Sequence, residues 1–387
     1  MKAGTDALSE YNRTGKTFEP SQLSVSDFYD YWMKNYCEVN LSDNTTRSYE
    51  TVIRLYVKPM IGQYYLNSID TVTLQEFINQ VYVEHGFKRS YLNTILKVLR
   101  EGFRYACRTC KFIALDPASD VQLPNTDVKE DDDIIVLSKE DVSRILDRFK
   151  DYPYQYYPML IAYYTGMRIS EVYGLTWDCI DFEKQTITVN KIIKKFDYNS
   201  KKIKNFHGIK GKAQTKWYLG ACKTSSSYRT IKIGNTLSMA LRAYKSWQER
   251  CQSEYMEYYI KSYKKSEKTR NGRPVELIIQ RDSTIPNDCP YEEVKLVCVK
   301  ENGEFHGTDS MKYPSKVINS ELNIRFNFHA FRHTHATMLI EQGVPVKAVA
   351  ERLGHSNVRT TLDVYVKVTE IMENNAVDVF EANGSLQ

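Results

Sequence analysis

The sequence predicts a mainly α-helical fold with a small antiparallel β-sheet, divided between two domains. Three observations support this fold class. Apolar residues recur at helical spacing through residues 21–122, two short segments between 185 and 233 alternate as strands do, and a charged stretch without periodicity separates the two regions. A chain of 387 residues is long enough to give each domain its own core.

Residues 1–20 are polar and are expected to be irregular, whereas residues 21–122 are expected to form a helical domain. Four patterns place apolar residues at i, i+3 and i+4, so that one face of each helix contributes to a shared core. Ser42, Asp43 and Asn44 are candidate caps for the second helix, which should stop near Pro59 and Gly62. The four patterns span Phe28–Trp32, Tyr49–Tyr56, Leu74–Val81 and Leu92–Phe103.

Residues 123–137 have the composition of a linker, with Pro124, a run of acidic residues and no apolar periodicity. Ser138, followed by Asp141, has the pattern of a helix start, so a second domain is expected over residues 138–372. Residues 373–387 are expected to form a tail. An apolar stripe runs from the end of the domain into this tail and could pack on its own domain or on a neighbouring subunit. It consists of Met372, Ala376, Val379 and Phe380.

The second domain is predicted to contain both helices and β-strands. Residues 185–189 and 228–233 alternate in the way of strands, and Trp217–Leu219 is a candidate strand between them. Residues 252–290 resemble an insertion, rich in Tyr, Lys and turn formers, whose structure the sequence leaves open. Helical periodicity then returns and is interrupted at Gly354.

Composition restricts the class of protein. Hydrophobic residues make up 42% and charged residues 26%, as in ordinary globular proteins, and no apolar run reaches the roughly 18 residues that span a membrane. The N-terminus lacks the apolar core of a secretory signal, so a cytosolic protein is expected. The eight cysteines are scattered, and the Cys107–Cys110 pair has no second pair at zinc-binding spacing. Buried or half-buried thiols are therefore expected there.

The distribution of charge is uneven. Residues 191–216 contain nine lysines and one acid, whereas residues 370–387 contain four acids and no basic residue. This pattern favours an anionic partner at the first segment and a protein contact at the second, with solvated loops as the alternative. The candidate anion contacts are Lys191, Lys194, Lys195, Lys210, Lys212 and Lys216.

A set of basic residues follows in order along the second domain. Arg168 comes directly after a Thr-Gly-Met turn at an expected helix start, and Lys223 precedes the last predicted strand. His329 and Arg332 are three residues apart and therefore share a helical face. Gly354 is expected to end the next helix, which would let the ring of His355 turn back toward the same place.

Two arginines, a lysine and two histidines offer many hydrogen-bond donors and no acid, which suits a phosphate diester. Tyr365, ten residues beyond His355, is a candidate nucleophile. A phenol has a pKa near 10 and needs a base or a positive field to attack at neutral pH. His329 could accept its proton, the arginines could stabilise charge at phosphorus, and Lys223 could protonate the leaving 5′-oxygen. Such a covalent intermediate conserves the bond energy, so neither ATP nor a cofactor is expected.

Each residue also has a structural interpretation on its own. The chain has 29 tyrosines, and a single tyrosine therefore indicates little. His329, His333 and His335 resemble a metal cluster, but no acidic fourth ligand accompanies them, so no metal is expected. The lack of a carboxylate cluster also disfavours a two-metal nuclease. The interpretation depends on the whole set occurring in order.

These motifs resemble those of the tyrosine recombinases, or phage-type integrases, over about residues 22–375. The resemblance assigns catalytic roles to Arg168, Lys223, His329, Arg332 and His355, makes Tyr365 the nucleophile, and gives Glu171 a supporting role in orienting the site. Ala330 departs from the family pattern, in which an aspartate often follows the first histidine. The predicted hairpin before the last strand is long and rich in lysine, so Lys216, Lys212 and Lys210 are alternatives to Lys223.

The resemblance implies a SAM-like core-binding domain followed by a catalytic domain that together clamp duplex DNA. The expected function is site-specific recombination through a 3′-phosphotyrosine and a Holliday junction, which integrates and excises a mobile element. The expected partners are double-stranded recombination sites, three further copies in a tetramer and an excisionase, at the bacterial nucleoid. A type IB topoisomerase, an Xer-type resolving recombinase and a catalytically silent DNA-binding regulator are the alternatives.

Phage and conjugative-element integrases usually carry an arm-binding domain ahead of the core-binding one. Some twenty residues precede the first predicted helix here. The sequence is therefore expected to be either a shortened integrase or a recombinase without that domain. The long hairpin and the 252–290 insertion favour a mobile-element integrase.

Overall fold

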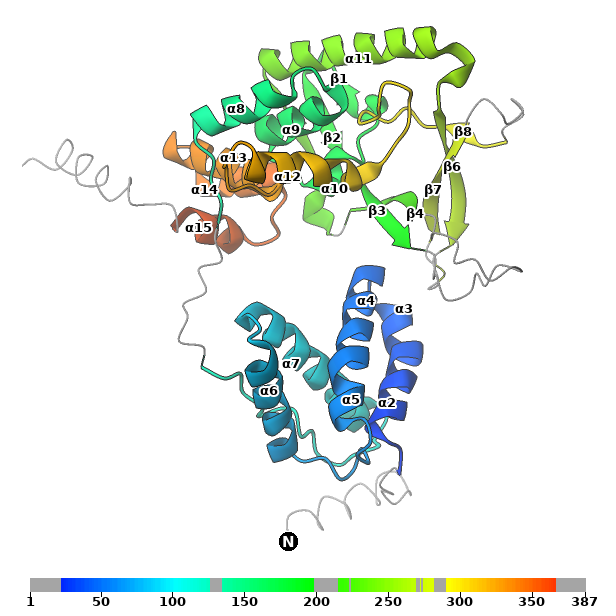
Figure 1. Ribbon diagram of the computed structural model, residues 1–387, viewed down its shortest axis with the longest axis vertical. Helices are drawn as coiled ribbons and strands as arrows, with labels where there is room; N and C mark the ends of the chain where they lie inside the picture. The colour runs from blue at the N-terminus through cyan, green and yellow to red at the C-terminus, as the bar shows by residue number, and fades with distance from the viewer. Residues whose placement is uncertain are drawn as a thin grey trace, which may run out of the picture. The chain divides into compact units, whose positions relative to one another are not determined.

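The computed structural model describes residues 22–125, 134–197, 215–222, 224–268, 272, 274–281 and 290–366. The chain divides into two compact units, one formed by residues 1–132 and the other by most of residues 133–387 (Figure 1). Helices predominate in both units and the sheets are antiparallel, which confirms the predicted fold class. None of the helices in the described ranges combines the length and apolar character of a membrane span.

The first unit is all-helical, and its four predicted helices are confirmed. Ser42 caps the second, accepting a hydrogen bond from the Thr45 backbone N–H. The helical conformation continues past Pro59 and ends at Ile61, with Gly62 as the C-cap, close to the predicted end. The elements are α2 (Val25–Trp32), the π-helical η1 (Met33–Cys37), α3 (Glu38–Asn40), α4 (Asp43–Val52), η2 (Ile53–Val57), α5 (Lys58–Ile61), α6 (Thr71–His85), α7 (Arg89–Arg104) and η3 (Tyr105–Thr109).

The helices of this unit enclose one aromatic-rich core. Phe28 and Trp32 of α2 are fully buried, as are Leu99 and Phe103 of α7. Tyr31, which lies within the first predicted pattern, Phe28–Trp32, is instead 41% exposed. Cys107 and Cys110 are free, half-buried thiols, as predicted.

The second unit begins where Ser138 caps α8 by accepting a hydrogen bond from the Asp141 backbone N–H. Its helices pack around α9, which contacts α8, α10, α11 and α13. The helical elements are α8 (Lys139–Phe149), α9 (Pro153–Thr165), α10 (Ile169–Val172), η4 (Trp177–Cys179), η5 (Ser225–Ser227), α11 (Asn235–Tyr255), η6 (Met256–Tyr258), η7 (Gly307–Met311), α12 (Lys312–Ser320), α13 (His329–Glu341), α14 (Val346–Leu353) and α15 (Val358–Val366).

Two antiparallel sheets complete this unit, with strand orders β1-β2-β5 and β3-β4-β7-β6-β8. The strands predicted at 185–189 and 228–233 pair directly with each other as β2 and β5, placing Ile187 opposite Ile231. The candidate strand at Trp217–Leu219 forms, but it pairs with β3 and β7 in the second sheet. The strands are β1 (Ile180–Asp181), β2 (Thr186–Val189), β3 (Lys191–Asp197), β4 (Thr215–Ala221), β5 (Arg229–Lys232), β6 (Lys261–Lys268), β7 (Pro274–Arg281) and β8 (Glu292–Glu293).

The 252–290 insertion supplies β6 and β7 of the five-stranded sheet (Figure 1). Lys261–Lys268 reads KSYKKSEK and lacks apolar alternation, which is why its sequence did not predict a strand. Pairing along the whole of β7 and ion pairs between strands stabilise it instead, such as Lys264 with Glu292 at 2.8 Å.

Gly166 ends α9 at the point where α9 meets α13 and α14. Its φ is +67°, and a Cβ there would overlap the Leu353 side chain and lie 2.9 Å from Cδ2 of His335. We expect Gly166→Ala to lower the free energy of unfolding by about 2 kcal/mol more than a left-handed glycine in open space would, because of overpacking. Gly343→Ala is the matched control, since Gly343 has φ +81° with no atom within 4 Å. Urea denaturation of both variants measures the difference, and equal losses would contradict the packing argument.

Candidate active site

Arg332 lies at the centre of the candidate site and is only 2% exposed. It projects from the first turn of α13, and its Nη1 and Nη2 donate to the carbonyls of Gly166 and Leu353, each at 2.8 Å. The side chain therefore joins the ends of α9 and α14. Burial and the charge of Arg168 lower the pKa of Arg332 to about 9, so it remains a cation at neutral pH. Two of its five N–H groups are used in these bonds, which leaves donors for an anion.

Arg168 is the residue before α10, and Glu171 holds it. One oxygen of the Glu171 carboxylate accepts from Arg168 Nη1 at 2.8 Å, and the other accepts from the Arg168 backbone N–H at 2.9 Å. Burial raises the pKa of Glu171, but hydrogen bonds and charge from Arg229 and Arg168 outweigh burial and lower it overall. Glu171 is thus a buried carboxylate, whereas the Arg168 side chain remains 34% exposed and accessible to a ligand.

His355 sits in the turn after α14, where Gly354 adopts φ +71°, as the sequence predicted. Its Nδ1 lies 2.8 Å from the hydroxyl of Thr361, a fully buried residue of α15. The turn is therefore attached to the helix that carries Tyr365. The backbone of Tyr365 belongs to α15, one turn beyond Thr361, and its side chain lies outside the described part of the chain.

His329 begins α13, and its ring meets that of His333 edge-on, with centroids 4.7 Å apart. Burial, His333 and the charges of Arg332 and Arg168 lower the pKa of His329 to about 4. Burial and the same two arginines lower the pKa of His355 to about 3. Both imidazoles are therefore neutral at pH 7 in the free protein, and a neutral imidazole is able to accept a proton.

Hydrogen bonds place these residues near one another, because Arg332 donates to Gly166, two residues before Arg168, and to Leu353, two residues before His355. His329 lies in the same first turn of α13 as Arg332. Arg168 and Arg332 each act on the pKa of His329 and of His355, and Arg168 acts on that of Arg332. The structure thus brings together side chains from the start of α10, the start of α13 and the turn after α14. The resulting cluster presents cations and neutral imidazoles, with its carboxylate engaged by arginines.

Arg229 of β5 was not among the predicted site residues. Its side chain is 7% exposed, and its Nη2 donates to Glu171 at 2.9 Å. A signal was available, because strand periodicity places Arg229 on the same face as Ile231 and Ile233, which are buried. A buried arginine requires partners, so this position could have been singled out.

His335, one of the three histidines that resemble a metal cluster in the sequence, forms hydrogen bonds within the protein with both ring nitrogens. Arg352 Nε donates to its Nε2 at 3.0 Å, so Nδ1 carries the proton and donates to the Tyr163 carbonyl at 2.8 Å. Across the described ranges, no three His, Cys, Asp or Glu side chains gather closely enough to hold a metal ion.

Of the predicted lysines, Lys223, Lys210 and Lys212 lie outside the described residues, as does the side chain of Lys216. The remaining three belong to β3. Lys191 pairs with Asp178 at 3.9 Å and Lys195 with Asp309 at 2.7 Å. Lys194 instead lies over the Tyr218 ring at 5.9 Å. Burial raises the pKa of Cys222, the residue before Lys223, and the charge of Lys194 acts in the opposite direction. The apolar stripe at 372–380 also lies outside the described residues.

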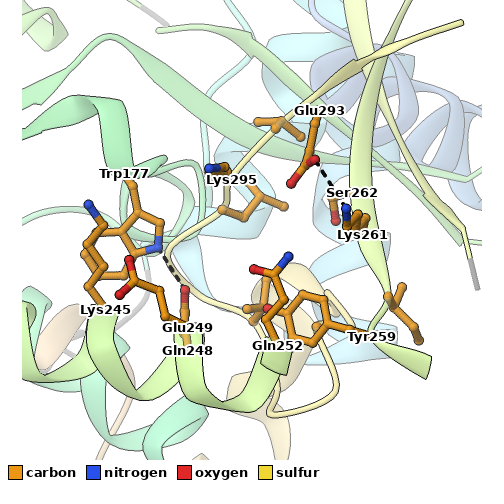
Figure 2. A pocket seen from close by; sticks show the side chains of 15 residues that line it. Trp177, Lys245, Gln248, Glu249, Gln252, Tyr259, Lys261, Ser262, Glu293 and Lys295 are labelled. Carbon is orange, nitrogen blue, oxygen red and sulfur yellow. Dashed lines mark hydrogen bonds and ion pairs between the residues drawn. The ribbon is translucent and has the colours of Figure 1, made fainter. Parts of the chain in front are cut away.

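A separate pocket of about 190 Å³ lies between α11, β6 and the segment that follows β8 (Figure 2). Its lining mixes charges of both signs, and none of the predicted catalytic residues contributes to it. Trp177 Nε1 donates to Gln248 at 2.8 Å on one side, and Lys261 pairs with Glu293 at 3.9 Å on the other. This pocket is distinct from the candidate site.

The buried histidines predict a loss of stability in acid. The pKa of His335 is about 4 in the folded chain and 6.5 ordinarily, so the unfolded chain binds more protons between these values. The free energy of unfolding should therefore fall as pH drops from 6.5 to 4, by about 3 kcal/mol through His335 alone. Urea titrations at several pH values check this. Glutamine cannot be protonated, so the stability of His335→Gln should depend less on pH than that of the wild type. His85→Gln, at an exposed position, is the control and should not weaken the dependence. An unchanged dependence in His335→Gln would contradict the assignment.

Comparison with known proteins identifies the family. The model of the phage integrase family matches residues 136–274 and 309–371, more than half of the chain. The chain belongs to the phage integrase family. The model of the phage integrase N-terminal SAM-like domain matches residues 24–82, within the helical unit. Members of this family are DNA strand-transferring enzymes.

Relatives support this membership over nearly the whole chain. A "Tyrosine recombinase XerC-like" protein of Caldanaerobacter subterraneus subsp. tengcongensis is 26% identical over 371 residues, which are 95% of this chain and 85% of that protein. The integrase of Staphylococcus phage L54a is 24% identical and covers 95% of both chains.

Solved structures share the fold. The Tn1549 transposon integrase in complex with a circular intermediate DNA has a TM-score of 0.62 at 21% identity, covering 89% of this chain and 95% of that one. The lambda integrase tetramer bound to a Holliday junction has a TM-score of 0.55 at 14% identity, covering 94% of this chain and 85% of that one. This integrase-family chain therefore has the tyrosine recombinase fold.

Proposed function

We propose that this protein is a site-specific recombinase that cleaves and rejoins DNA strands through a 3′-phosphotyrosine at Tyr365. The observation that carries the proposal is the cluster of Arg168, Arg332, His329 and His355 beside the helix that bears Tyr365. Its free N–H donors suit the non-bridging oxygens of a phosphate diester, and the carboxylate within it is engaged by arginines. Family membership supports the same function.

In the proposed reaction, the Tyr365 oxygen attacks phosphorus, and the bond to the 5′-oxygen of the next nucleotide breaks. His329, neutral in the free protein, accepts the phenolic proton. Arg168 and Arg332 stabilise the charge that develops on the phosphate oxygens, and Lys223 donates a proton to the leaving 5′-oxygen. The 5′-hydroxyl of the cleaved strand from the other duplex then attacks the phosphotyrosine. The Tyr365 oxygen leaves, and the DNA strand is rejoined.

Recombination needs two DNA duplexes, so we infer that four copies assemble on paired sites and exchange strands through a Holliday junction. The lambda integrase tetramer on such a junction, which has the same fold, supports this inference. We infer further that the substrate is the end of a mobile element in a bacterial cytoplasm, with an excisionase setting direction. The phage L54a and Tn1549 integrases, both from mobile elements, support this substrate, whereas the relative named XerC-like supports the alternative of an Xer-type recombinase.

A nicked suicide substrate that carries the cognate site tests the function. When attack occurs next to the nick, the short fragment that carries the freed 5′-hydroxyl diffuses away. The strand cannot then be rejoined, and the covalent complex accumulates. We expect a protein–DNA adduct that survives denaturation and forms equally well in EDTA, because no step of the mechanism uses a metal. A protein that binds the site tightly without forming an adduct would be a silent regulator, and an adduct that requires metal would contradict the mechanism.

The lysines of β3 yield a separate prediction about DNA binding. Among the described residues Lys194 has no acidic partner, whereas Lys195 is paired with Asp309. We therefore expect Lys194→Ala to reduce the slope of log K against log salt by about 0.9, the value for one lost phosphate contact. Lys195→Ala, the matched control, should reduce it less. Fluorescence anisotropy in a Tyr365→Phe background measures both, and a larger change in the control would contradict the prediction.

A further inference from the structure

Arg229 makes three hydrogen bonds that reach three different segments of the catalytic unit. Nη2 donates to the carboxylate of Glu171 at 2.9 Å, and Nε donates to the carbonyl of Arg352 at 2.7 Å. Nη1 donates to the carbonyl of Ser227 at 3.1 Å. Its side chain is 7% exposed, and all three of its nitrogens donate to acceptors within the protein.

Each of these segments adjoins a residue of the proposed reaction. Glu171 holds the backbone and guanidinium of Arg168. Arg352 lies in the last turn of α14, just before the turn that carries His355. Ser227 closes the short segment that follows Lys223.

Packing at Gly354 shows how closely Arg229 meets the His355 turn. A Cβ on Gly354 would lie 3.1 Å from Arg229 Nη1 and 2.8 Å from the carbonyl of Ser226. The turn therefore rests directly on the arginine and its neighbouring segment. Arg352 extends the connection, because its own guanidinium donates to His335 of α13 and to the Lys232 carbonyl of β5.

We propose that Arg229 is a positioning residue for strand transfer, which holds Arg168, the His355 turn and the segment after Lys223 in one arrangement without contacting DNA. The inference rests on the proposed recombinase function. A planar guanidinium with five donors is suited to three acceptors in different directions, whereas a lysine ammonium is a point charge on a flexible stem. Arg229→Lys should therefore retain the ion pair with Glu171 but lose hydrogen bonds to the carbonyls of Arg352 and Ser227.

Single-turnover cleavage of the nicked suicide substrate at saturating DNA tests the proposal. We expect Arg229→Gln to slow cleavage on the order of 100-fold, because small displacements of reacting groups have effects of this size. Arg229→Lys should recover part of that rate. DNA affinity, measured in a Tyr365→Phe background, should stay near that of the parent. Arg242→Gln is the control, since Arg242 also donates to a backbone carbonyl, that of Phe182, at 3.1 Å.

The dependence of cleavage on pH separates positioning from simple destabilisation. Arg229 helps to keep the carboxyl of Glu171 ionised, so its removal should raise the pKa of Glu171 and make cleavage more sensitive to acid. Cleavage by Arg229→Gln should therefore decline below pH 7 more steeply than cleavage by the wild type or by Arg229→Lys. Among the residues that the structure describes, the titratable and charged groups that interact with Glu171 are Arg168, Arg229, Arg332, His329 and Cys222.

Several results would overturn the proposal. Wild-type cleavage with a wild-type pH profile in Arg229→Gln would show that the residue has no such role. A loss of DNA affinity equal to the loss of rate would show a DNA contact instead. If thermal scans show that neither variant folds, Arg229 is required for folding rather than for position. Absence of an adduct with the wild-type chain would contradict the recombinase function itself, which distinguishes the two failures.

Discussion

Replacing Tyr365 by phenylalanine should abolish covalent attachment to DNA, with a loss on the order of 10⁶-fold, as found when an enzyme loses its nucleophile. The substitution removes one hydroxyl oxygen, and no other group in the proposed mechanism can form the bond to phosphorus. Folding and non-covalent binding should persist, because the change is confined to one atom of α15. Gel analysis of denatured reactions with the suicide substrate measures the adduct, and anisotropy measures binding.

Tyr313→Phe is the matched control. Tyr313 lies in α12 of the same unit, is 61% exposed and has no part in the proposed reaction. This variant should form the adduct at the wild-type rate. An adduct that persists in Tyr365→Phe would mean that another residue attacks the DNA.

The second large effect is expected at Arg332. Arg332→Gln removes a buried cation and should slow cleavage on the order of 10³-fold, the upper range for one lost donor to a developing negative charge. It should also lower the free energy of unfolding by about 2 kcal/mol, because the carbonyls of Gly166 and Leu353 lose their partner. Single-turnover cleavage and urea denaturation measure the two effects separately.

Arg332→Lys helps to separate charge from geometry. Lysine keeps the charge but cannot reach both carbonyls, so its cleavage rate should fall between those of wild type and Arg332→Gln. Arg148→Gln is the control, since Arg148 forms an exposed pair with Glu321. Wild-type cleavage by Arg332→Gln would contradict the role of this arginine in the site.

Local signals in the sequence were enough to predict the helices and the turns that carry the site. The apolar stripes define the core of the first unit, and Ser42 and Ser138 cap helices as their spacing indicates. Gly354 ends α14 in a left-handed conformation, which places His355 in a turn. These features depend on neighbours within a few residues, and for that reason a sequence pattern reveals them.

Features that depend on distant partners were not predictable. The strand Lys261–Lys268 lacks apolar alternation and forms through pairing with β7 and ion pairs across strands. Trp217–Leu219 was recognised as a strand, but its partners in the second sheet are set by tertiary structure. Two of the three partners of Arg229 lie 58 and 123 residues away in the chain, so no local pattern joins them.

Mass spectrometry of the covalent adduct tests the central claim most directly. After digestion of the DNA and of the protein with trypsin, Tyr365 falls in the peptide spanning residues 360–367. We expect this peptide to carry a nucleotide joined through its 3′-phosphate to the oxygen of Tyr365. A nucleotide on any other peptide, or one joined through a 5′-phosphate, would contradict the proposed reaction.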